Sequence, residues 1–120
     1  MHELPPDVLH LIDRAIGSLQ ALELLLLLRR SPETYWAASA VAGTLGGDVR
    51  VVRRELAALV NAGLVVSGSQ TGAYRFAPRR EADRDAVEQL AAAYGDERRL
   101  SIVDAIASRS VRALAGAFRF

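Results

Sequence analysis

Five consecutive leucines at positions 24–28 constrain the fold of this chain more than any other feature. In a helix, five successive side chains cover most of the circumference, so such a helix has to be buried on more than one side. Glu23 and Arg29–Arg30 bound the run, which is much shorter than the roughly 20 apolar residues that span a bilayer. We therefore predict a central core helix over residues 19–30, with Ser18 as its N-cap.

Composition limits the chain to one domain, or one domain with an appendage. The 120 residues are 51% hydrophobic, which suffices for a packed core. There is no cysteine, so no disulfide and no thiolate metal site is expected. The residues from Met1 to Asp7 lack the positive region of a signal peptide. We therefore expect a soluble, cytoplasmic protein.

Few residues of the chain have the pattern of a catalytic or metal site. Asp7, His10 and Asp13 lie three residues apart in a helix that we expect to begin at Pro5–Pro6. Helix surfaces often carry such residues, and no other ligand cluster accompanies them, so we expect no metal or cofactor. We also find no nucleophile–base pairing and no phosphate loop, so we do not expect an enzyme.

A helix predicted over about residues 48–62 combines an apolar stripe with an arginine face. Asp48 is a good N-cap after the Gly46–Gly47 turn, and Gly63 suits a left-handed C-cap. The stripe has the three- and four-residue spacing of one helix face, and consists of Val49, Val52, Leu56, Leu59 and Val60.

Arg50, Arg53 and Arg54 project away from this stripe. None of them has an acidic residue three or four positions away, so no helix-surface salt bridge at that spacing is expected. Arg50 and Arg54 are four apart, and like charges at that spacing cost a few tenths of a kcal/mol. This arginine face is either a solvated surface or a binding surface for an external anion, and we favour the anion-binding surface.

Positive charge is concentrated in one third of the sequence. Residues 48–80 carry six arginines against two acids, whereas residues 1–47 carry three against five and residues 81–120 carry six against seven. Such a local excess is typical of a module that binds nucleic acid.

A β-hairpin is predicted over about residues 64–77. Residues 64–66 are apolar, and Tyr74 and Phe76 alternate with Arg75. Gly68 and Gly72 permit a loose turn between the two runs. The polar turn residues are either phosphate or sugar contacts or an ordinary soluble loop; they are Ser69, Gln70 and Thr71.

A further helix is predicted over residues 33–45, with Trp36 as a core anchor, before the Gly46–Gly47 turn. Two helices joined by a short glycine turn make a helix-turn-helix unit. The expected architecture is mainly α with a small β-hairpin wing, divided into an N-terminal helix (1–17), a central unit (18–78) and C-terminal helices (79–120).

The central unit resembles the winged helix-turn-helix superfamily of bacterial transcriptional regulators, and in outline the MarR-like and PadR-like domains. The resemblance covers roughly residues 18–78. It is carried by Leu22-Glu-Leu-Leu-Leu-Leu-Leu28, Val41-Ala-Gly-Thr-Leu45, the ladder Val52…Leu56…Leu59…Gly63-Leu-Val65, and Tyr74-Arg-Phe-Ala-Pro78. It implies that the helix from Asp48 enters the DNA major groove and that the 67–72 turn lies along the backbone or minor groove. Arg50, Arg53 and Arg54 would then face the groove, with Arg75 on the wing.

Three apolar stripes follow the hairpin, and they exceed what one small wing needs to cover. They either fold back on the same core or form a dimer interface or docking surface for another protein. We favour the interface because an aromatic C-terminal tip is costly to leave in water. The residues assigned to it are Tyr94, Ile102, Val103, Ile106, Leu114, Phe118 and Phe120.

Two functions are compatible with these patterns. The first is a transcriptional regulator that binds double-stranded DNA, with the C-terminal helices pairing two subunits. The second is an adaptor that binds a regulatory protein and does not contact DNA, since fold does not settle function.

Overall fold

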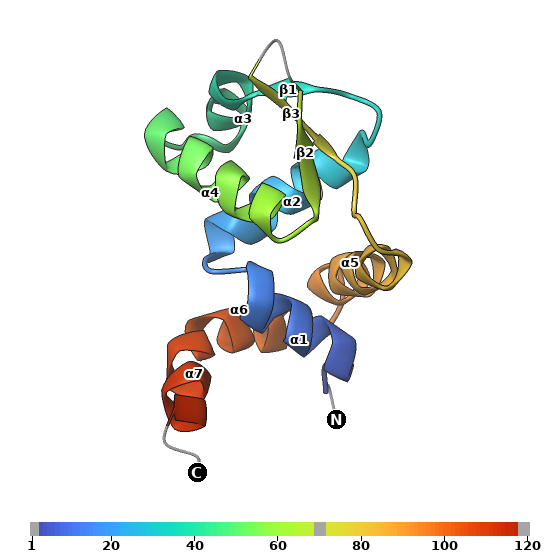
Figure 1. The fold of residues 1–120 in the computed structure, drawn as a ribbon. Coiled ribbons are helices and arrows are strands. Elements are labelled where there is room, and N and C mark those ends of the chain that lie inside the picture. The colour runs from blue at the N-terminus through green and yellow to red at the C-terminus, as the bar shows by residue number, and fades with distance from the viewer. Residues whose placement is uncertain (1–2, 69–71, 118–120) are drawn as a thin grey trace.

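The computed structural model describes residues 3–68 and 72–117 and is mainly helical, with one small three-stranded antiparallel sheet (Figure 1). The fold class predicted from the sequence, mainly α with a small hairpin, is confirmed at this level. The elements are α1 (Pro6–Ala15), α2 (Leu19–Arg30), β1 (Trp36–Ala37), α3 (Ala38–Leu45), α4 (Val49–Asn61), β2 (Val65–Ser67), β3 (Ala73–Phe76), α5 (Glu81–Tyr94), α6 (Arg99–Ala107) and α7 (Arg109–Ala117).

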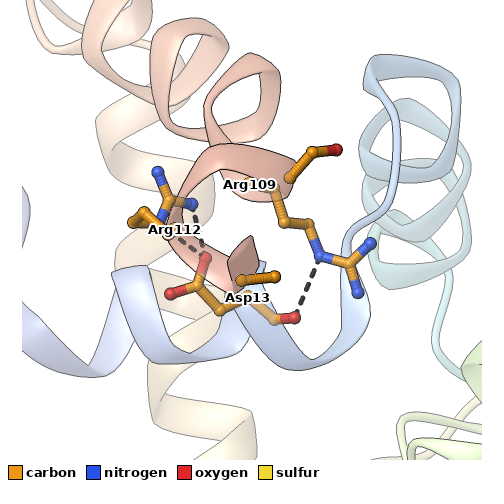
Figure 2. Close-up of a pocket in the computed structure, with 5 residues that line it drawn as sticks. Asp13, Arg109 and Arg112 are labelled. Atoms are coloured by element: carbon orange, nitrogen blue, oxygen red, sulfur yellow. Dashed lines mark hydrogen bonds and ion pairs between the residues drawn. The ribbon is translucent and has the colours of Figure 1, made fainter. Parts of the chain in front are cut away.

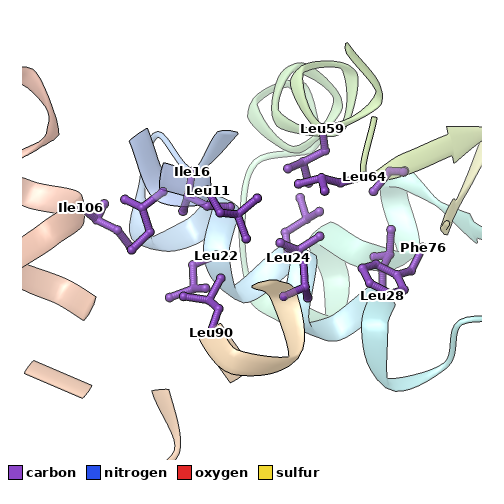
Figure 3. Close-up of a cluster of buried hydrophobic side chains, with 14 of the residues drawn as sticks. Leu11, Ile16, Leu22, Leu24, Leu28, Leu59, Leu64, Phe76, Leu90 and Ile106 are labelled. Atoms are coloured by element: carbon purple, nitrogen blue, oxygen red, sulfur yellow. The ribbon is translucent and has the colours of Figure 1, made fainter. Parts of the chain in front are cut away.

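Helix α2 lies at the centre of the molecule, as predicted. Leu22, Leu24, Leu25 and Leu28 are fully buried in one cluster that includes residues from both halves of the chain (Figure 3). The Ser18 side chain accepts a hydrogen bond from the backbone N–H of Ala21 and caps the helix. The sheet, α3 and α4 pack on one part of α2, while α1 packs with α5, α6 and α7 (Figure 1).

The segment before α3 differs from the prediction. We expected a helix from residue 33, but the helix begins only at Ala38, and Trp36–Ala37 form the short strand β1. Trp36 pairs with Tyr74 and Ala37 with Ala73, so β1 lies on the free edge of β3 and the sheet order is β1-β3-β2. Pairing with a distant strand thus replaces the first turns of the predicted helix.

Glycines with left-handed backbone conformations lie on both sides of α4. Gly46 has φ 77° and Gly63 has φ 79°, in the left-handed region that favours glycine. The Asp48 side chain accepts a hydrogen bond from the backbone N–H of Arg50 at 2.8 Å, which confirms its role as N-cap. Val52, Leu56 and Leu59 of the predicted stripe are completely buried, so the opposite face of α4 points outward.

The C-terminal helices share the core of the central unit, which corrects part of the predicted interface. Ile102 is fully buried and Ile106 is 9% exposed, and both belong to the same cluster as the α2 leucines (Figure 3). Tyr94 also packs against this cluster. Helices α5 and α6 therefore bury their apolar stripes against their own chain, mainly against α1.

Candidate nucleic-acid interface

The outward face of α4 presents the arginines that the sequence predicts. Arg50, Arg53 and Arg54 are exposed, and the Arg50 side chain retains 84% of its accessible surface. Arg53 and Arg54 make no hydrogen bond or close ion pair with the described part of the chain. Because α4 buries its apolar stripe, these side chains extend from a helix fixed on the core.

Arg50 differs from its neighbours because it has an acidic partner two residues earlier. Its guanidinium donates to the Asp48 carboxylate, with 3.2 Å between Nη2 and Oδ2. The hydrogen bond from the Arg50 side chain, with help from the Arg50 backbone N–H, lowers the pKa of Asp48 below its usual value. The carboxylate is therefore ionised at neutral pH and offsets one of the positive charges. The two residues are only two positions apart, outside the three- and four-residue spacing of helix-surface pairs, so the sequence pattern does not predict this pair.

Arg75 lies on the sheet and is held by the turn before β1. Its guanidinium stands 5.4 Å from the ring centroid of Tyr35 and donates to the carbonyl of Pro32 at 3.4 Å. Val66, its partner across the strands, is 36% exposed, and Tyr35 is 51% exposed. The outer face of the sheet thus carries an aromatic–cation pair that the sequence does not predict, because the predicted helix over residues 33–45 includes Tyr35.

The remaining predicted wing contacts, Ser69, Gln70 and Thr71, lie outside the described residues. The strands that lead to them are in place. Val65 pairs with Phe76 and Ser67 with Tyr74, and the backbone N–H of Gly68 donates to the carbonyl of Ala73 at 2.7 Å.

The C-terminal end of α4 is held by Arg14, which also binds a buried carboxylate. Arg14 of α1 donates to the carbonyl of Ala62 at 3.2 Å and to the carboxylate of Asp83 at 2.8 Å. Arg80 also donates to Asp83, with 3.2 Å between Nε and Oδ2. Asp83 is 8% exposed, the only buried charged residue in the described ranges. Arg14 therefore ties the C-terminal end of α4 to α1 and α5.

Helix α7 is held against α1 by its charged residues (Figure 2). Arg112 binds the carboxylate of Asp13, and Arg109 donates to the carbonyl of Asp13 at 2.9 Å. Two apolar side chains of the same helix are exposed: Val111 at 68% and Leu114 at 60%. Leu114 is thus available for the predicted interface. Val103 is half-buried, while Phe118 and Phe120 lie outside the described residues.

The acidic and histidine residues of α1 do not assemble a metal site. Asp13 is engaged by Arg112, and no group of three or more histidine, aspartate or glutamate residues within 3–68 and 72–117 is arranged to hold a metal ion. None of the helices in these ranges has both the length and the apolar character needed to cross a membrane.

Comparisons of this chain with protein-family models, with curated proteins and with solved structures gave no match.

Proposed function

We propose that this protein is a DNA-binding transcriptional regulator of the winged helix-turn-helix type, with α4 in the major groove and the β2–β3 hairpin along the backbone. The order of elements supports this assignment. Helices α3 and α4 meet at the left-handed Gly46, and β2 and β3 follow directly after α4. The third strand, β1, precedes α3 and completes the small sheet.

The arginine face of α4 is the observation that carries the proposal. The helix has 13 residues, so it is about 20 Å long, and the major groove is about 12 Å wide and accepts a helix. Three guanidinium groups extend from its exposed side. Arginine pairs with phosphate oxygens, and it also binds the O6 and N7 atoms of guanine with two hydrogen bonds. Each guanine contact contributes about 1–3 kcal/mol of discrimination between bases.

Asp48→Asn is expected to strengthen DNA binding a few-fold. Asparagine caps a helix as well as aspartate does, so α4 keeps its N-terminal hydrogen bond. The substitution removes a negative charge from the face and releases the Arg50 guanidinium from its partner. Fluorescence anisotropy with labelled random-sequence duplex DNA measures the change. An equal or lower affinity would show that Asp48 does not compete with DNA for Arg50.

The wild-type protein provides the first test. We expect it to bind random duplex DNA at low salt and to lose affinity steeply between about 50 mM and 200 mM salt. Absence of binding at the lower concentration would contradict the proposal.

The second candidate function is that of an adaptor that binds a regulatory protein through α7, and the same helix could pair two subunits. The exposed apolar side chains of α7 favour such a contact. A helix that packs on its own chain normally buries apolar residues and exposes charged ones. In α7, Arg109 and Arg112 are turned to α1, while Val111 and Leu114 face solvent. A second subunit or a regulatory protein would cover these two side chains. Pairing of two subunits through α7 is compatible with DNA binding, whereas the adaptor becomes the leading function if DNA binding is absent.

A further inference from the structure

We infer that Tyr35 is a positioning residue for DNA binding, which holds the guanidinium of Arg75 in the orientation that contacts a phosphate. This role rests on the proposed function, in which the β2–β3 hairpin lies along the DNA backbone. Tyr35 belongs to the turn before β1, whereas Arg75 lies in β3, the middle strand of the sheet. The two residues are far apart in the sequence and meet only in the folded chain.

The Arg75 side chain lies on the outer face of the hairpin. Its neighbour Phe76 is 3% exposed and packs in the central cluster, and successive side chains of a strand point to opposite faces of the sheet. Arg75 is half-buried, and its partner across the strands, Val66, is exposed. The guanidinium is therefore carried by the solvent side of the element that we propose to follow the DNA backbone.

The turn before β1 restricts this guanidinium at two points. The guanidinium lies 5.4 Å from the centroid of the Tyr35 ring, and its Nη1 donates to the carbonyl of Pro32 at 3.4 Å. A guanidinium has five N–H donors, so these contacts leave others for a phosphate oxygen. A free arginine side chain loses conformational entropy when a ligand immobilises it. A guanidinium already held by the ring loses less, so its contact with phosphate is stronger.

The Tyr35 ring also lies against the hairpin itself. A Cβ atom at Gly68 would stand 3.3 Å from Cε1 of the ring, so a larger residue there would push the ring away. The backbone N–H of Gly68 donates to the carbonyl of Ala73 and joins β2 to β3 at this point. Strand β1, which follows Tyr35, pairs with β3 and leads directly into α3 (Figure 1). Tyr35 thus connects the arginine of the hairpin to the segment that precedes α3 and α4.

NMR spectroscopy of the full chain without DNA tests the contact itself. Protons held over the face of an aromatic ring are shifted upfield, and we expect this shift for the Arg75 side chain. Tyr35→Phe should keep the shift, because the Tyr35 hydroxyl makes no hydrogen bond with the described part of the chain. Tyr35→Leu should lose it, since leucine is apolar but has no ring.

A double-mutant cycle with random duplex DNA, measured by fluorescence anisotropy, tests the positioning role. An exposed contact between a cation and an aromatic ring corresponds to about two- to five-fold in an equilibrium constant. Tyr35→Leu should therefore lower DNA affinity about two- to five-fold, and Tyr35→Phe should bind as the wild type does. Arg75→Gln should lower the affinity and flatten the salt slope by about 0.9. In the Arg75→Gln background, Tyr35→Leu should have no further effect, because Tyr35 acts through Arg75.

Tyr94→Leu is the matched control. The Arg99 guanidinium lies 4.2 Å from the centroid of the Tyr94 ring, so the same kind of pair is removed from the C-terminal helices. This variant should keep the wild-type DNA affinity. A loss as large as that of Tyr35→Leu would contradict a role specific to the hairpin.

Three further results, obtained with a wild type that binds DNA, would overturn the role of Tyr35 alone. They are an unchanged affinity in Tyr35→Leu, an equal loss from Tyr35→Leu with and without Arg75→Gln, and a Tyr35→Phe variant that binds as weakly as Tyr35→Leu. A wild type that shows the upfield shift of Arg75 but binds no DNA would instead disprove the proposed function, and with it the role of Tyr35. The two failures are therefore distinguishable.

Discussion

Leu24→Ala should lower the free energy of unfolding by about 2–5 kcal/mol, the range found when a buried leucine is truncated. Leu24 has no exposed surface and lies in the central cluster (Figure 3). The loss has two sources, because the removed methyl groups no longer leave water on folding and the surrounding helices cannot fully close the cavity. Urea denaturation followed by circular dichroism measures the change.

Leu100→Ala is the matched control for this substitution. Leu100 is 80% exposed, so the same truncation should change the stability by less than about 0.5 kcal/mol. Equal losses at the two positions would contradict the central position of α2 in the core.

Asp83→Ala should cost about 1–3 kcal/mol, because it removes the acceptor of hydrogen bonds from charged donors at a buried position. Arg14 and Arg80 both donate to this carboxylate, and its side chain is only 11% exposed. Loss of the contact also releases Arg14, which joins α1 to the C-terminal end of α4 through the carbonyl of Ala62. The α4 end should therefore exchange its amide hydrogens faster in this variant.

Glu88→Ala removes a carboxylate that is equally well paired but exposed. Glu88 accepts two hydrogen bonds from Arg29, at 2.8 and 2.6 Å, and its side chain is 51% exposed. Exposed ion pairs contribute about 0–1 kcal/mol, so this control should be nearly neutral. A control that costs as much as Asp83→Ala would show that burial is not what distinguishes the two pairs.

Local sequence signals were sufficient for the helices with clear periodicity and caps. The leucines of α2 and the stripe of α4 repeat at helical spacing, and Ser18, Asp48 and Gly63 mark helix ends by their own chemistry. These features depend only on residues within one or two helical turns, so they can be predicted from the sequence alone. The same local pattern placed three arginines on the exposed side of α4.

Features that depend on distant partners were not predictable in this way. Trp36–Ala37 form a strand only because the edge of β3 is there to pair with them. Arg14 and Asp83 are 69 positions apart, and no spacing rule links them. The stripes of α5 and α6 showed that one face is buried, but periodicity does not show whether a partner or the same chain covers it. For that reason the sequence pattern predicts an interface at Ile102 and Ile106, which the structure buries in the chain's own core.

The contact between Tyr35 and Arg75 was not predictable for the same reason, because it depends on a distant partner. A short edge strand had to be recognised before the ring could be placed beside a side chain of β3. The two together form an exposed feature of the sheet, separate from the arginines of α4.

The salt dependence of DNA binding tests the role of α4 most directly, because its slope counts the phosphate charges that the protein neutralises. The comparison is between the wild type and the triple variant Arg50→Ala/Arg53→Ala/Arg54→Ala. We expect the slope of log K against log salt to flatten by about 0.9 for each of these arginines that contacts a phosphate. A second triple variant, Arg29→Ala/Arg84→Ala/Arg98→Ala, removes the same charge from α2, α5 and the start of α6.

The α4 variant should bind weakly with a shallow slope, and the control variant should keep the wild-type slope. An equal flattening in both variants would mean that net charge, and not the α4 face, determines binding. A wild-type slope in the α4 variant would contradict the placement of this helix on DNA.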